Sequence, residues 1–146
     1  MIKDYKILKE LGYGFSGTIY KVERNGKKYA LKIQHIFEED LYPNIQSAIW
    51  REIKFSKDFA NKYPEQFVQL EDYFFIKNCS HKQRYPYKVH KNFSNYVRKR
   101  NESKYCSIKI YTLVDNTLDK LDLGVKEYYS VFLQVLYGVY LMNKYG

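Results

Sequence analysis

The stretch that decides the fold reads Leu11-Gly12-Tyr13-Gly14-Phe15-Ser16-Gly17-Thr18-Ile19, with glycines in the pattern Gly-x-Gly-x-x-Gly. Glycine lets a backbone come close to a ligand, because it carries no side chain. The pattern alone fits a flexible hairpin or a dinucleotide site. A dinucleotide site requires the third glycine to open a helix. Residues 18–22 instead alternate β-branched and aromatic side chains, which is typical of a strand. We therefore predict a glycine-rich turn between two strands.

The residues on either side extend this interpretation to a set of antiparallel strands. Strands are indicated over residues 5–11, 18–22 and 28–36. Asn25-Gly26 separates the second from the third. This dipeptide favours a two-residue type I′ hairpin turn, because both central residues of that turn need a positive φ.

Helical and strand patterns alternate over the rest of the chain. Residues 44–60 predict a helix with Ile45, Ile49 and Ile53 along one stripe. Residues 67–76 and 107–114 predict the fourth and fifth strands. Residues 125–145 predict a long helix, apolar around much of its circumference and standing apart from the sheet. The expected fold class is α+β, a five-stranded antiparallel sheet with one main packed helix, followed by a second helix.

The residues around the glycines resemble the protein kinase family. Leu11 precedes the first glycine, Ile19 follows the third, Ala30-Leu31-Lys32 lies in the next strand, and Glu52 lies on the following helix. The family carries a Gly-x-Gly-x-x-Gly-x-Val loop, an Ala-x-Lys strand and a helix-borne glutamate. The resemblance implies a kinase-like N-lobe over residues 1–114, and the hinge and first C-lobe helix over residues 115–146.

The resemblance also implies which residues bind ATP. The glycine backbone would approach the phosphates, and Lys32, positioned by Glu52, would contact the α- and β-phosphates. An apolar slot would accept the adenine, with Tyr111 as gatekeeper and the backbone at Leu113 and Val114 along the adenine edge. The candidate nucleotide-binding residues are Leu11, Gly12, Gly14, Gly17, Ile19, Ala30, Lys32, Glu52, Tyr111, Leu113 and Val114.

The family's catalytic loop and Mg²⁺-binding residues have no counterpart in these 146 residues. We therefore assign no catalytic residue and no metal ligand. The expected function is the ATP-binding portion of a protein kinase, inactive by itself, with a complementing C-lobe polypeptide or a protein substrate as partner. One alternative is a non-catalytic, pseudokinase-like module that binds a nucleotide or a partner.

The net charge of +9 is concentrated in one segment. Residues 77–104 hold nine Lys or Arg residues and one acid, Glu102. We interpret this segment as a basic insertion or long loop. Aromatic residues among its cations make a nucleic-acid-binding protein the second alternative; a solvated loop is the simpler interpretation.

Cys79 and Cys106 are the two cysteines, too few for a disulfide framework. We expect both to be reduced in an intracellular, cytoplasmic protein, because the chain shows neither a signal peptide pattern nor a membrane span. His81 and His90 are spaced too irregularly from Cys79 for a zinc site.

Overall fold

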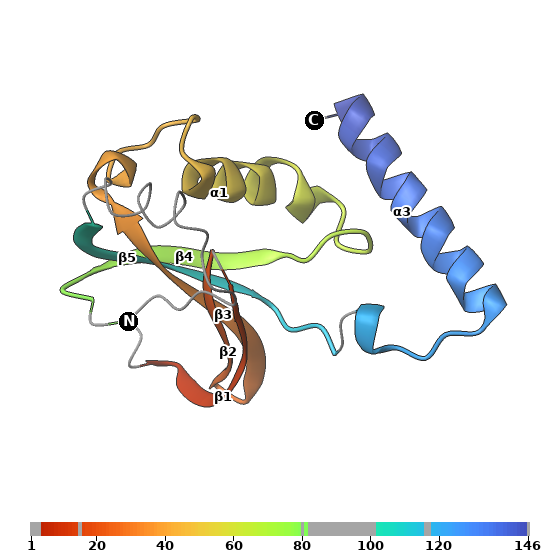
Figure 1. Ribbon diagram of the computed structural model, residues 1–146, viewed down its shortest axis with the longest axis horizontal. Helices are drawn as coiled ribbons and strands as arrows, with labels where there is room; N and C mark the ends of the chain where they lie inside the picture. Colours follow the sequence, from red (N-terminus) through yellow and green to blue (C-terminus); the bar gives the residue numbers. More distant parts are fainter. Residues whose placement is uncertain (1–3, 15, 80, 82–101, 116–117, 146) are drawn as a thin grey trace, which may run out of the picture.

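The computed structural model describes residues 4–14, 16–79, 81, 102–115 and 118–145 of the chain. Five antiparallel strands form one sheet, as the sequence predicts (Figure 1). Their order in the sheet is β1-β2-β3-β5-β4. The strands are β1 (Lys6–Gly14), β2 (Gly17–Arg24), β3 (Lys27–Phe37), β4 (Leu70–Lys77) and β5 (Glu102–Thr112).

Two turns in the first three strands depend on their glycines. Asn25 and Gly26 both have positive φ, 51° and 76°, which confirms the hairpin between β2 and β3. Gly17 opens β2 with a φ of +120°, and a Cβ there would lie 2.3 Å from the carbonyl oxygen of Ile33. A side chain at Gly17 would therefore collide with the backbone of β3.

The helix α1 (Ala48–Asp58) begins later than predicted. Asn44 starts a turn instead: its side chain accepts a hydrogen bond from the Gln46 backbone at 2.9 Å, and its carbonyl accepts one from the Ser47 N–H at 2.9 Å. Ser47 has extended backbone, so the helix starts only after it. Ile49 and Ile53 are buried as expected. Ile45 lies before the helix and is exposed.

The strand boundaries correct the predicted insertion over residues 77–104. Lys77 ends β4 and pairs with Tyr105, while Glu102 starts β5 and pairs with Phe37. Both ends of the supposed insertion are therefore strand, because pairing with β3 and β4 continues past the point where apolar alternation ends. Likewise β4 begins at Leu70 rather than at residue 67, and β5 begins well before residue 107. Residues 80 and 82–101 lie outside the described residues.

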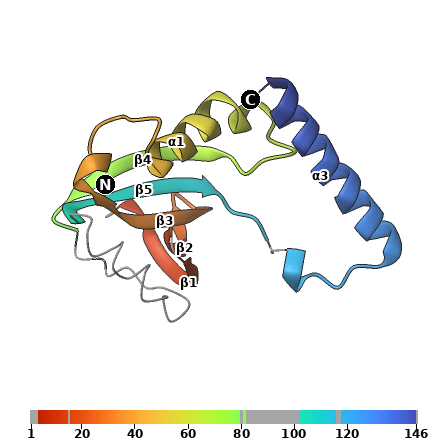
Figure 2. The same ribbon diagram turned by 45° about the horizontal axis from the view of Figure 1, so that its top comes forward.

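Side chains alternate between two faces of the sheet. The face under α1, which we call the helix face, has a core of Ile36, Ile49, Ile53 and Leu70. Figure 2 shows α1 lying along β4 and β5 on this side. The other side, the opposite face, has a separate core made of Tyr5, Val22, Leu31, Ile33, Cys106, Ile108 and Ile110.

The structure pairs Cys79 with Cys106 in a disulfide, whereas the sequence analysis expects two thiols. The two residues lie 27 positions apart in sequence, with a Cα–Cα distance of 5.7 Å. The end of β4 returns to β5 here, since the Cys79 N–H donates to the Lys104 carbonyl at 3.2 Å. Sheet register, which spacing alone does not reveal, brings the two sulfurs together.

The last helix, α3 (Val125–Tyr145), has the predicted bounds and stands apart from the sheet (Figures 1 and 2). Its ring at Tyr145 stacks on Tyr63 with centroids 6.2 Å apart. Gly138 and Leu141 are its buried residues. Among the described residues, no helix has the length and apolar content needed to span a membrane.

Short 3-10 turns complete the described chain: η2 (Glu38–Asp40), η3 (Ala60–Lys62) and η4 (Leu118–Lys120). The segment from η4 to the start of α3 connects the sheet to this separate helix (Figure 1).

Candidate functional site

A cavity of about 910 Å³ lies between the β1–β2 glycine turn, β3, α1 and the residues that follow β5. All the candidate residues of the sequence analysis line it: Leu11, Gly12, Gly14, Gly17, Ile19, Ala30, Lys32, Glu52, Tyr111, Leu113 and Val114. Further lining residues, which the sequence analysis does not name, include Phe55, Phe67 and Val68. A concave, partly apolar cavity with a few polar groups is the usual form of a small-molecule site.

The glycines leave room above the cavity. A Cβ at Gly12 or Gly14 would meet no atom of the described residues within 4 Å, so packing against those residues does not require a glycine at either position. Gly14 pairs with Gly17 across the turn between β1 and β2. Gly12, Gly14 and Gly17 therefore line the cavity without adding a side chain to it.

Strand pairing gathers the apolar and cationic parts of the site. Ile19 of β2 pairs with Lys32 of β3, and Ala30 pairs with Tyr111 of β5. Ile19 and Leu11 are 37% and 40% exposed, so both leave apolar surface beside the cavity rather than in the core. A flat apolar group and a negative group could be bound side by side here.

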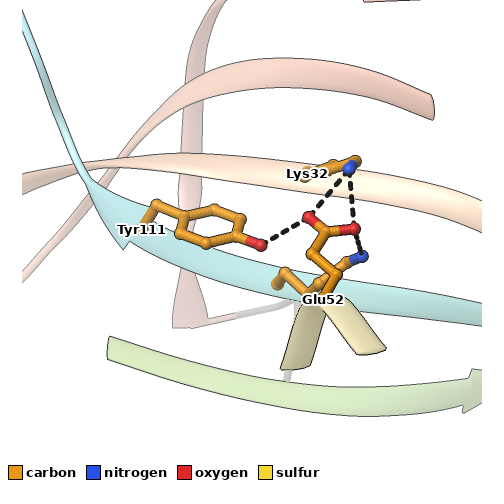
Figure 3. Close-up of polar contacts among 4 residues, drawn as sticks. Lys32, Glu52 and Tyr111 are labelled. Atoms are coloured by element: carbon orange, nitrogen blue, oxygen red, sulfur yellow. Dashed lines mark hydrogen bonds and ion pairs between the residues drawn. The ribbon is translucent and has the colours of Figure 1, made fainter. Parts of the chain in front are cut away.

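Lys32 and Glu52 form the polar centre of the site. The Lys32 Nζ lies 2.9 Å from Oε1 and 3.0 Å from Oε2 of Glu52. The Lys32 side chain is only 13% exposed. Figure 3 shows the Glu52 carboxylate between the Lys32 amine and the Tyr111 hydroxyl. Glu52 thus fixes the lysine at the cavity wall, as the sequence analysis expects.

A second lysine, which sequence reasoning missed, shares the same carboxylate. Lys109 pairs with Lys32 in the β3–β5 ladder and is fully buried. Its Nζ lies 2.5 Å from Glu52 Oε2. The available signal was a lysine between Ile108 and Ile110 in an apolar strand, because a buried charge requires a partner.

Tyr111 completes the group around Glu52. Its hydroxyl donates a hydrogen bond to Oε1 at 2.6 Å. Burial, followed by this hydrogen bond and the negative charge of Glu52, raises the pKa of the Tyr111 phenol. The ring lines the cavity as a neutral group, tethered to the helix.

The lysines determine the charge of Glu52. Burial alone would raise the pKa of this carboxyl, but the charges of Lys109 and Lys32 and the hydrogen bonds from Lys109 and Tyr111 outweigh it. The net result lowers the pKa of Glu52 to about 2. Glu52 is therefore an ionised, fully engaged counter-ion near neutral pH.

The pKa of Lys109 is lowered, whereas an isolated ion pair with a carboxylate raises the pKa of a lysine. Burial and the charge of Lys32 lower its pKa to about 8, although Glu52 counteracts both. Two lysines thus compete for one carboxylate. Near neutral pH the three groups carry a net positive charge beside the cavity, which favours an anionic ligand.

Leu113 and Val114 lie where the chain leaves β5. Thr112 makes two hydrogen bonds with the backbone of Gln69: its N–H donates to the Gln69 carbonyl at 3.0 Å, and its hydroxyl accepts from the Gln69 N–H at 3.1 Å. Leu113 is half-buried and Val114 is exposed. The anchored Thr112 places the next two residues along the cavity.

No protein-family model matches the sequence, and no curated protein is significantly similar to it. Any assignment for the cavity therefore depends on its geometry and chemistry.

Proposed function

We propose that this chain binds ATP in the cavity, as the ATP-binding portion of a protein-kinase-like phosphotransferase. The observation that carries the proposal is one arrangement: Lys32 is fixed by Glu52 at the wall of a cavity roofed by Gly12 and Gly14. An open glycine backbone and a positioned lysine are two groups that nucleotide-dependent phosphotransferases use to hold phosphates.

Each part of the cavity has a role in this proposal. Lys32 supplies a point charge for the α- and β-phosphates, while the turn from Gly12 to Gly17 provides backbone N–H donors. The adenine occupies the apolar part beside Ile19 and Ala30, next to the chain at Leu113. Glu52 binds no ligand itself; it keeps the lysine extended toward the phosphates.

Mg²⁺, when bound with ATP, neutralises charge on the phosphates. Glu52 does not suit a role as a ligand for that ion, because both of its oxygens already accept from Lys32, Lys109 and Tyr111. In our proposal the described residues of this chain therefore bind and orient the nucleotide, and the metal ligands belong to other residues.

Calorimetric titration of the purified chain with ATP at millimolar concentration tests the proposal. We expect weak binding, and Lys32→Ala should weaken it about 10- to 100-fold, because a hydrogen bond to a charged group contributes roughly 1.5–3 kcal/mol. Lys28→Ala is the matched control: Lys28 lies on the same strand but is exposed and away from the cavity.

Two results would contradict the proposal. One is the absence of any heat or competition signal with ATP for a chain that shows normal far-ultraviolet circular dichroism. The other is an equal loss of binding in Lys28→Ala and Lys32→Ala, which would indicate general attraction of an anion to a basic protein.

The surface of α3 supports the proposal that a C-lobe-type polypeptide covers this helix. Its exposed apolar side chains include Val125, Tyr128, Tyr129, Phe132, Leu133, Val135, Leu136 and Val139. Contiguous apolar surface of this kind usually marks a contact site. A supplied kinase C-lobe polypeptide should lower the fluorescence of a hydrophobic dye bound to the chain. Unchanged dye fluorescence and no co-elution would contradict this partner.

A further inference from the structure

Two cysteines and a histidine meet on the opposite face of the sheet, away from the cavity. One ring nitrogen of His35 and the sulfurs of Cys79 and Cys106 all lie within 4.8 Å of one another. His35 and Cys106 are direct partners in the β3–β5 ladder, so their side chains project from the same face. Cys79 reaches them from the end of β4, after Asn78 turns the chain with a φ of 55°.

The hydrogen bonding of His35 leaves one of its ring nitrogens available. Its Nε2 contacts the backbone carbonyl oxygen of His81. A carbonyl only accepts, so Nε2 carries the proton and, in the neutral ring, Nδ1 carries a lone pair. That Nδ1 is buried and, among the residues that the structure describes, has no hydrogen-bond partner. A buried acceptor without a partner is costly, and a bound metal ion would satisfy it.

The hydrogen bond from His35 Nε2 to the His81 carbonyl is of the kind that a metal-ligating histidine normally makes. Such a histidine donates its other ring N–H to a carbonyl or carboxylate, which fixes the tautomer and the ring orientation. Here the carbonyl is itself positioned, because the His81 ring nitrogen Nε2 lies 3.2 Å from the Thr18 hydroxyl. The support for a ligating His35 is therefore present on the opposite face.

We propose that the reduced chain binds one Zn²⁺ ion through the thiolates of Cys79 and Cys106 and the imidazole Nδ1 of His35. Two thiolates and an imidazole suit zinc, whereas Mg²⁺ and Ca²⁺ prefer oxygen ligands. Cys79 and His35 are half-buried, so a water molecule can complete the tetrahedral coordination from solvent.

The disulfide is the oxidised form of the same site. Reduction by a thiol or phosphine adds two electrons and two protons and breaks the S–S bond, giving two thiols. Zn²⁺ then displaces the two thiol protons and forms two Zn–S bonds. In a reducing compartment the thiol form is the expected one, since disulfides there are rare.

Zinc binding requires the two sulfurs, bonded to each other in the disulfide, to move apart after reduction. Zinc bonds of about 2.0–2.3 Å and tetrahedral angles place two ligand atoms roughly 3.3–3.8 Å apart. A ring nitrogen of His35 and the two sulfurs lie within 4.8 Å of one another, and the strands that carry His35 and Cys106 are already paired. The ion would link β3 and β5 to the segment after β4.

This site is independent of the proposed nucleotide site. His35 projects from the opposite face, whereas Lys32 and Lys109 project from the helix face toward Glu52. Sequence spacing predicts no zinc site because it considers only the histidines near Cys79. The ligand His35 comes from a distant strand, and only the sheet register brings it near the cysteines.

Zinc titration of the tag-free, full 146-residue chain, reduced with a phosphine, tests the proposal against a chromophoric chelator. We expect one Zn²⁺ per chain, and Co²⁺ should give thiolate charge-transfer and tetrahedral ligand-field absorption. His35→Gln should weaken binding at least about 100-fold, more than the 10- to 100-fold typical of losing an outer hydrogen-bond partner. Lys28→Gln, an exposed position at the far end of the same strand β3, is the control and should bind within about threefold of wild type, since it lies in no part of the proposed site.

A second measurement does not depend on variants that fold. The wild-type chain oxidised with glutathione disulfide should bind no zinc, and reduction should restore binding. Zinc should then raise the Tm of the reduced chain above the Tm of the reduced chain without zinc. Zinc binding that is equal in the oxidised and reduced chains would overturn the proposal. So would the absence of zinc uptake by the reduced, folded chain, unchanged binding in His35→Gln, or an equal loss in Lys28→Gln.

Discussion

The two faces of the sheet bury neighbouring residues of β5 equally deeply but by different means. Ile108 on the opposite face and Lys109 on the helix face are both 0% exposed. Ile108 contacts apolar side chains of the adjacent strands, so its burial is favourable in itself. Lys109 is buried only because α1 brings Glu52 within 2.5 Å of its amine. Equal burial therefore has two different causes: apolar packing for Ile108, and an ion pair with Glu52 for Lys109.

The stability of the two faces depends on different numbers of residues. Stability on the opposite face is distributed over many apolar contacts. On the helix face, Lys32, Lys109 and Tyr111 all depend on a single carboxylate. One substitution at Glu52 should therefore affect three partners together.

Glu52→Gln should have the largest effect, since it leaves two cations without a counter-ion. We expect the free energy of unfolding at pH 7 to fall by about 4 kcal/mol, as when one partner of a buried ion pair is removed. Urea denaturation measures it. Arg51→Gln, on the exposed side of the same helix, is the control and should change stability by less than about 0.5 kcal/mol.

The stability of the protein at acid pH offers a second test of Glu52→Gln. The pKa of Glu52 is about 2 in the folded chain and near 4.5 unfolded, so its contribution to stability is complete above pH 4.5. That contribution is lost as the pH falls from about 4.5 to 2. Glu52→Gln should lack this part of the acid-induced loss; an identical acid profile in both proteins would contradict the assignment.

Ile108→Ala should have the next largest effect, by a different mechanism. It leaves a cavity among the apolar residues of the opposite face, and a loss of about 3 kcal/mol is typical of such a truncation. Unlike Glu52→Gln, it should leave ATP binding nearly unchanged, because Ile108 does not line the cavity. Combined urea denaturation and ATP titration would separate the two cases, and strongly impaired ATP binding by a folded Ile108→Ala protein would contradict the separation of the faces.

Lys109→Met should have the smallest effect at pH 7, within about 1 kcal/mol, because Lys32 and Tyr111 still satisfy Glu52. Its pH dependence is more informative. The pKa of Lys109 is about 8 when folded and about 10.5 unfolded, so the unfolded chain holds more protons between these values. Wild-type stability should therefore gain a rising component from about pH 8 to 10.5.

Thermal or urea unfolding across that pH range, with Lys109→Met and wild type side by side, isolates this component. As the pH rises, the free energy of unfolding of wild type should increase relative to that of Lys109→Met. A constant difference would show that Lys109 titrates normally, and that its burial costs less than the structure indicates.

The sequence by itself determined the local features of the molecule. Turn chemistry at Asn25-Gly26, strand alternation and helical periodicity depend on near neighbours, and they correctly predicted the antiparallel sheet, the hairpin and the bounds of α3. The candidate cavity residues were also accessible, because their motif spacing resembles that of a known family. The structure places all of them on one cavity, and ATP binding there remains our proposal.

Tertiary structure alone decided the contacts that join distant strands. Lys109 lies 57 residues from Glu52, and Cys106 lies 27 residues from Cys79. Which residues meet across a sheet depends on strand order and register, and a shift of one residue would move each side chain to the other face. No local pattern specifies that register. The second lysine on Glu52 and the cluster of His35 with two cysteines therefore became visible only once β3, β4 and β5 were paired.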